Sequence, residues 1–147
     1  MIHENLWMVL LSIGILSSTL VSCGEQDASQ KMEYRYVNNS GASITITART
    51  KDLLKTTNIE RGDSLVQVLL FENGSGFSDI YIITADSISI TYNSERRTIY
   101  TYKDSLASRS PLNFINYEVT SLRGINSFNR FTFTSKDFEE ATPIGAE

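Results

Sequence analysis

The sequence predicts an all-β protein, either a small antiparallel β-sandwich of immunoglobulin-like architecture or a barrel, with about seven to eight strands. Runs of alternating polar and apolar residues recur after residue 32, and turn-forming residues separate them at intervals of about ten residues. Helical periodicity is rare over the same region. The sequence has no Cys–Trp–Cys pattern, so "immunoglobulin-like" describes the architecture only.

The chain begins with a segment that has the pattern of an export signal. Residues 6–20 are uncharged and apolar, and the run ends in small residues before the only cysteine. It is shorter than the ~20 residues of a membrane-spanning helix. The first five residues depart from the pattern, because they contain Glu4 and no Lys or Arg. The alternative interpretation is a buried helix with one core cysteine.

The pattern divides the chain into three parts. Residues 1–22 are expected to be a signal peptide, and the small, polar and acidic residues 23–31 a flexible tether. Residues 32–147 are expected to form a single β domain. The formal net charge is −4 and the basic residues are scattered, so we expect no nucleic-acid partner.

The end of the signal, Leu20-Val21-Ser22-Cys23, resembles the lipobox of bacterial lipoproteins. The resemblance implies a diacylglycerol on the sulfur of Cys23, cleavage before this residue and acylation of the new amino group. Two or more acyl chains give stable membrane attachment. With a polar tether and an aromatic-rich C-terminal strand, the chain is similar to small lipoproteins of unknown function from Bacteroidota-type Gram-negative bacteria. That similarity implies an anchor in the cell envelope, at the outer membrane, on its periplasmic or its surface face.

The first strands of the domain are expected at residues 34–37 and 43–48. The segment Asn38–Gly41 between them favours a turn, which predicts a β-hairpin. Residues 51–59 fit a short strand better than a helix, because they contain Thr-Thr-Asn. A turn is expected at 60–63.

The most continuously apolar run after the tether, 64–72, predicts a central strand covered on both sides. Asn73–Gly76 interrupts it, and 79–83 is a further short apolar run. The later segments predict a loop at 104–111, strands within 113–122 and 128–134, and a short helix at 135–141 that ends before Pro143.

The clearest hairpin joins the strictly alternating run 87–92 to the return strand 97–103 through a turn at 93–96. Pairing Tyr92 with Arg97 would align the isoleucines of both strands on one face. The other face would be rich in Ser and Thr and would carry two tyrosines of the return strand.

These tyrosines, Tyr100 and Tyr102, are the candidate binding surface of the sequence. Two aromatic rings on a polar strand face could form a platform for sugar rings or an anchor for a protein. The favoured alternative is that both rings pack beneath a loop or the second sheet, with their hydroxyl groups in water. Loss of the only tryptophan with the signal weakens the sugar-binding interpretation.

Cleavage before Cys23 would also remove His3, the only histidine, and acylation would occupy the only thiol. A Ser-His-Asp triad, a Cys-His nucleophile and the usual zinc and copper sites would then lack their residues. We therefore expect no enzyme activity, no metal and no other cofactor. A glycosidase would need a pair of carboxylates. The candidates are Asp79, Asp86, Asp104, Glu139 and Glu140, the last two of which better fit a solvated helix.

The sequence thus predicts a membrane-anchored cell-envelope lipoprotein with a non-catalytic binding or structural role. Its partners would be the membrane, through Cys23, and a glycan or an envelope protein. One alternative is a glycan-binding surface module that uses Tyr100 and Tyr102. Another is an inhibitor of a periplasmic hydrolase that inserts the loop 104–111 into an enzyme cleft.

Overall fold

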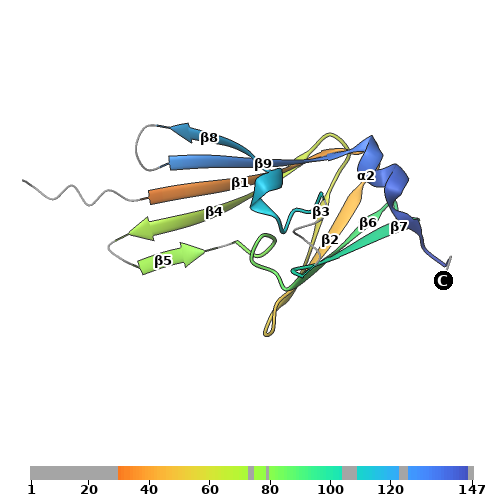
Figure 1. Cartoon of the computed structure of the whole chain (residues 1–147), viewed down its shortest axis with the longest axis horizontal. Helices are drawn as coiled ribbons and strands as arrows, with labels where there is room; N and C mark the ends of the chain where they lie inside the picture. Colours follow the sequence, from red (N-terminus) through yellow and green to blue (C-terminus); the bar gives the residue numbers. More distant parts are fainter. Residues whose placement is uncertain (1–29, 73–74, 79, 104–108, 123–125, 146–147) are drawn as a thin grey trace, which may run out of the picture.

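A computed structural model describes residues 30–72, 75–78, 80–103, 109–122 and 126–145 as two five-stranded β-sheets (Figure 1). The all-β sandwich is confirmed, and neither sheet closes into a barrel within these residues. Sheet A has the order β5 (Ser75–Ser78), β4 (Ser64–Glu72), β1 (Gln30–Asn39), β9 (Asn126–Thr134), β8 (Glu118–Leu122). Sheet B has the order β10 (Thr142–Pro143), β7 (Arg96–Thr101), β6 (Ser87–Tyr92), β2 (Ile44–Arg49), β3 (Leu54–Ile59). β5 and β10, which are very short, add to the expected seven to eight strands.

The core lies between the two sheets and follows from the alternation of the sequence. β2 and β6 bury every second residue, and the intervening residues are half-exposed. Sheet A contributes mainly aromatic rings to the same core. The largest fully buried side chains are Tyr36, Tyr92, Phe131, Phe133, Ile44, Ile46, Ile82, Ile88 and Ile90.

The hairpin expected for residues 34–37 and 43–48 is wrong. β1 pairs with β4 and β9 in sheet A, whereas β2 pairs with β3 and β6 in sheet B. Asn38 holds the crossing between the sheets, because its buried amide donates to the carbonyl oxygens of Ala42 at 2.8 Å and Ile59 at 3.0 Å. The segment predicted as a hairpin turn is therefore a bridge from one sheet to the other.

The short apolar run 79–83 is not a strand in the part that the structure describes. Tyr81 and Ile82 are buried in a loop, and the side-chain oxygen of Gln67 accepts their backbone N–H groups at 3.3 and 3.4 Å. The strand β5 lies just before them. The run is apolar because it fills the core. The side chain of Gln67 accepts the backbone hydrogen bonds that a neighbouring strand would otherwise accept.

The apolar strand β4 has neighbours on both edges, but its faces are not both covered as expected. Only Gln67 is buried between Ser64 and Phe71, and Val66 is 40% exposed. Figure 1 shows the reason: the halves of β1, β4, β8 and β9 nearest the chain's N-terminal end project past sheet B. The projecting end of sheet A thus leaves apolar side chains partly in water. A second departure from the expected antiparallel sandwich is that β1 and β9 pair in parallel.

The β6–β7 hairpin is present, but its predicted register is wrong by one residue. Tyr92 pairs with Arg96, and Ser89 pairs with Ile99. Asn93 and Ser94 both adopt positive φ angles, 48° and 61°, which close a tighter turn than the one expected. A shift of one residue exchanges the two faces of the return strand.

The short helix expected near the C-terminus is confirmed as α2 (Ser135–Glu140). Its N-cap is Thr134, which forms a capping box with Asp137. The segment expected to hold a strand at 113–122 starts with a 3-10 turn, η2 (Phe114–Asn116), before β8 begins. Tyr117, between η2 and β8, donates its hydroxyl to the carbonyl of Pro111 at 2.6 Å.

Candidate functional site

The predicted lipidation residue Cys23 lies outside the described residues, as do the signal and most of the tether. The described chain starts with β1 at Gln30, two residues before the expected start of the domain. No helix within the described residues combines the length and the apolar composition that crossing a membrane requires.

Tyr100 points into the protein, because the register of the β6–β7 hairpin pairs it with the buried Ile88. It is half-buried and packs against the core. Burial, together with the weaker effect of the nearby negative charge of Asp137, raises the pKa of its phenol to about 12. Tyr100 thus belongs to the core boundary, and the geometry on which its binding role was predicted is wrong.

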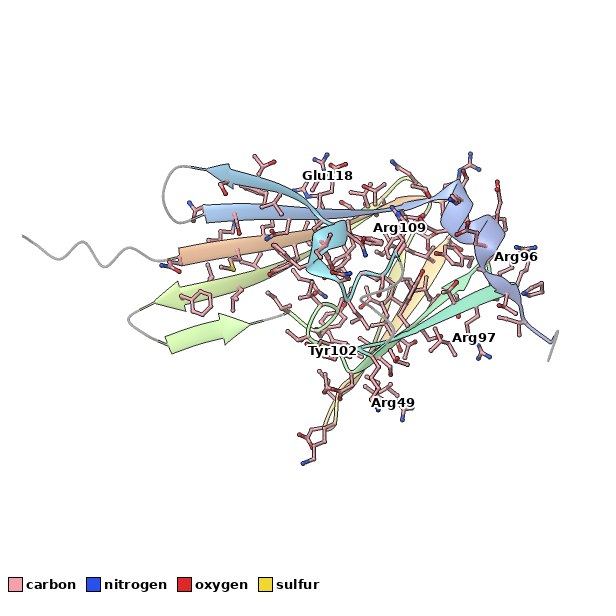
Figure 2. All side chains as sticks on the ribbon, in the orientation of Figure 1. Arg49, Arg96, Arg97, Tyr102, Arg109 and Glu118 are labelled. Carbon is pink, nitrogen blue, oxygen red and sulfur yellow. The ribbon has the colours of Figure 1, made fainter. Side chains whose placement is uncertain are left out.

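Tyr102 follows the last residue of β7, at the end of the hairpin opposite the turn (Figure 2). Its side chain is 69% exposed, and its backbone N–H donates to the carbonyl of Asp86 at 2.9 Å. One tyrosine packs inward and the other is exposed, so the structure does not bring the two rings together as a flat platform. A binding role for Tyr102 alone stays a prediction.

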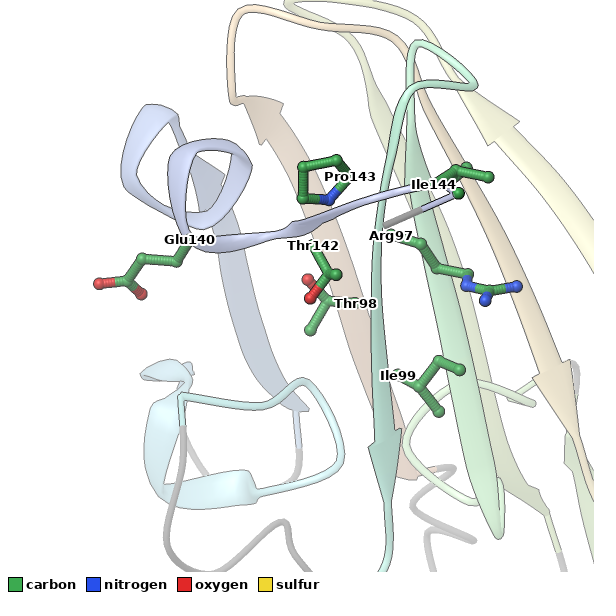
Figure 3. A pocket seen from close by; sticks show the side chains of 8 residues that line it. Arg97, Thr98, Ile99, Glu140, Thr142, Pro143 and Ile144 are labelled. Atoms are coloured by element: carbon green, nitrogen blue, oxygen red, sulfur yellow. The ribbon is translucent and has the colours of Figure 1, made fainter. Parts of the chain in front are cut away.

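An open cleft lies where the C-terminal segment crosses the outer edge of β7 (Figure 3). It has a volume of about 270 Å³. β10 pairs only with Arg96 and Arg97, so it leaves the rest of the β7 edge uncovered. Ile99 and Ile144 contribute exposed apolar surface, 59% and 48% exposed. This cleft was not predicted from the sequence, although the correct register of the hairpin would have placed Ile99 on a polar face.

The carboxylates considered for glycosidase chemistry are not brought together where the structure describes them. Asp86 precedes β6 at one end of sheet B, and Glu140 ends α2 near the other end, where β10 meets β7. The six residues of β6 between these ends span about 20 Å, more than the ~5–9.5 Å of a carboxylate pair. Asp79 and Asp104 lie outside the described residues.

Metal ligands show no grouping in the same part of the chain. Among the described residues, no three His, Cys, Asp or Glu side chains are placed to hold a metal ion. Glu140 instead forms an exposed i,i+4 ion pair with Lys136 at 3.6 Å. That contact fits the solvated helix face that the sequence suggests for Glu139 and Glu140.

The loop proposed for insertion into a hydrolase is described only at its end. Residues 104–108 lie outside the described residues, and Pro111 is buried. Arg109 donates to both carboxylate oxygens of Asp137 at 2.8 Å. The described end of this loop is therefore fixed against α2.

Comparisons with protein-family models, with curated proteins and with solved structures gave no match for this chain. The narrowest class that the geometry defines is an open two-sheet β-sandwich with a short C-terminal helix.

Proposed function

We propose that this protein is a lipoprotein of the bacterial cell envelope, anchored at the outer membrane through Cys23, with a non-catalytic binding or structural role. The observation that carries the proposal is the uncharged run 6–20 that ends at Leu20-Val21-Ser22-Cys23. The geometry of the described residues is compatible with such an anchor. β1 starts at Gln30 at one end of the sandwich, and the chain from Cys23 to Gln30 can reach at most about 25 Å (Figure 1).

This arrangement would hold the projecting end of sheet A close to the membrane surface. The cleft at β7 and the exposed Tyr102 would remain at other parts of the sandwich, where they could meet a soluble partner. A binding or structural role is proposed over an enzymatic one because cleavage before Cys23 would remove the only histidine, and acylation would occupy the only thiol.

The test is the fate of Cys23 in the native host. The intact mass should correspond to a chain that begins at Cys23 and carries two or three acyl chains, and the protein should partition into the outer-membrane fraction. Cys23→Ser should leave the chain uncleaved, unacylated and unable to incorporate labelled palmitate. Ser29→Ala, a similarly small change beyond the cleavage site, should behave as wild type. An unmodified thiol with Met1 still present would reject the proposal.

A further inference from the structure

The outer face of sheet A, which points away from sheet B, places two arginines side by side. Arg35 of β1 and Arg130 of β9 are direct partners in the parallel register. Neighbouring strands lie about 4.8 Å apart, so like charges in direct register repel each other unless something neutralises them. Both side chains are accessible, 45% and 56% exposed.

The two arginines differ in how they are neutralised. Arg35 donates to the carboxylate of Glu33 at 2.9 Å, and the Glu33 side chain is only 9% exposed. Arg130 forms an ion pair with Glu118 of β8, at 3.8 Å between two exposed groups. A pair of this kind contributes about 0–1 kcal/mol. Arg130 therefore keeps most of its donor capacity for another oxyanion.

The same face has a depression of about 320 Å³ next to the arginines. It is lined by Arg35, Thr120, Phe128, Asn129 and Arg130. Phe128 is half-buried and precedes Arg130 by two residues on β9, so both side chains point to this face. The volume lies at the lower end of the range for small-molecule sites.

We propose that this depression is a binding site for an acidic saccharide, a sugar ring that carries a carboxylate or sulfate group. The planar guanidinium group of Arg130 would hold the oxyanion through paired hydrogen bonds, and the positive charge of Arg35 lies beside it. The ring of Phe128 offers a flat apolar surface for the C–H face of a sugar, and the Thr120 hydroxyl can bond to a sugar hydroxyl. A neutral sugar would leave Arg130 without a close oxyanion, and an inorganic ion would leave Phe128 unused.

The site itself does not depend on the lipid anchor, because all of its residues lie on strands of sheet A. Only the choice of a saccharide, rather than another ring-bearing oxyanion, rests on the envelope location proposed above. The site could not be predicted from the sequence, because β1 and β9 lie near opposite ends of the described chain. The only local signal was the pair Phe128 and Arg130 on alternate positions of one strand.

The test is calorimetric titration of the full chain in detergent. Ligands are a galacturonic acid trimer, a sulfated disaccharide, a neutral galactose trimer, sodium acetate and sodium sulfate. We expect at least one acidic saccharide to bind roughly tenfold or more tightly than both the neutral trimer and its free ion. Comparing the galacturonic acid trimer with the sulfated disaccharide shows whether the site prefers a carboxylate or a sulfate group. Equal affinity for charged and neutral sugars, or for the free ion, would overturn the proposal, as would binding only to anionic phospholipid vesicles.

Variants locate the binding on this face. Arg130→Gln should weaken binding roughly tenfold, and Glu118→Gln, which removes the competing carboxylate, should strengthen it about two- to threefold. Arg61→Gln, the same charge change in the exposed β3–β4 turn, should bind as wild type. Arg130→Gln should fold normally because its described partner is an exposed group. Identical affinities for Arg130→Gln and Arg61→Gln would reject the site while leaving the anchoring test at Cys23 unaffected.

Discussion

Arg109 donates to both carboxylate oxygens of Asp137, each of which lies 2.8 Å from the same guanidinium nitrogen. The Asp137 side chain is 7% exposed, and one of its oxygens also accepts the backbone N–H of Thr134 at 2.6 Å. The contact thus joins the segment before η2 to the N-terminal cap of α2. Arg96 secures the other end of the helix, because it donates to the carbonyl oxygens of Phe138 and Ala141 at 3.2 and 3.1 Å.

Removal of Arg109 should therefore destabilise the C-terminal part of the fold. Arg109→Gln leaves a mostly buried carboxylate with only its capping bonds, and we expect the free energy of unfolding to fall by about 2 kcal/mol. Urea unfolding followed by circular dichroism measures the change. Arg61→Gln, an exposed arginine in a turn, should change stability by no more than about 0.5 kcal/mol. Equal stability of the two variants would show that the Arg109–Asp137 contact contributes nothing.

The hydroxyl group of Tyr92 should lower the stability of the folded protein. It is buried and has no hydrogen-bond partner among the described residues, while the ring packs edge-on against Phe138 at 5.8 Å. Tyr92→Phe keeps the ring and removes the unsatisfied hydroxyl, so we expect stability to rise by about 1 kcal/mol. Tyr117→Phe is the matched control, because its hydroxyl donates to Pro111 and its loss should destabilise the fold. A destabilised Tyr92→Phe variant would mean that its hydroxyl has a partner.

The buried tyrosines also predict how stability depends on pH. Burial raises the pKa of Tyr100 to about 12 and raises the pKa values of Tyr36 and Tyr117 above the usual 10.0. In the unfolded chain these phenols lose their protons near pH 10, earlier than in the folded protein. Their contribution to stability is therefore complete below about pH 10 and is lost as the pH rises towards about 12.

The urea midpoint should consequently fall between about pH 10 and 12, with tyrosinate absorbance at 295 nm appearing as the protein unfolds. Tyr100→Phe should make this decline shallower, because one of the raised phenols is gone. Full tyrosinate absorbance in a still-folded protein near pH 10 would contradict the burial of these rings.

The register of the β6–β7 hairpin can be tested by cross-linking. Ser89 and Ile99 are direct partners, and antiparallel partners have Cα atoms about 4.5–5.5 Å apart, within the range for a disulfide. In a Cys23→Ser background, Ser89→Cys with Ile99→Cys should oxidise to one intramolecular disulfide, detected as a loss of two hydrogens in the intact mass. The pair Ile90→Cys with Ile99→Cys should not, because these positions face opposite sides. The reverse result would restore the register first predicted from the sequence.

The sequence predicted which segments form strands better than how the strands are arranged. Alternation in 43–48 and 87–92 follows directly from one buried face, so β2 and β6 were located correctly. The turn length was misjudged because Asn93 and Ser94 both adopt a left-handed conformation without a glycine. The composition of the run 79–83 could not distinguish a loop from a strand, because burial in either gives the same apolar residues.

Candidate sites made of contiguous residues could be predicted from the sequence, whereas sites that depend on strand pairing could not. Cys23 could be singled out because the residues that resemble a lipobox, 20–23, are contiguous in the sequence. The depression at Phe128 and Arg130 could not, because Arg35 comes to it through long-range pairing of strands. Tyr100 was assigned to the wrong face because its orientation depended on a single residue of register.

The parallel pairing of β1 with β9 has a consequence for when the chain can fold during its synthesis. β1 is the central strand of sheet A, yet one of its two partners is almost the last strand to leave the ribosome. The sheet cannot be completed until Thr134 has been synthesised, so its central strand lacks one of its two neighbours until almost all of the described chain has been made. Truncation anywhere before β9 should accordingly yield an aggregation-prone fragment with an unprotected strand edge rather than a smaller domain.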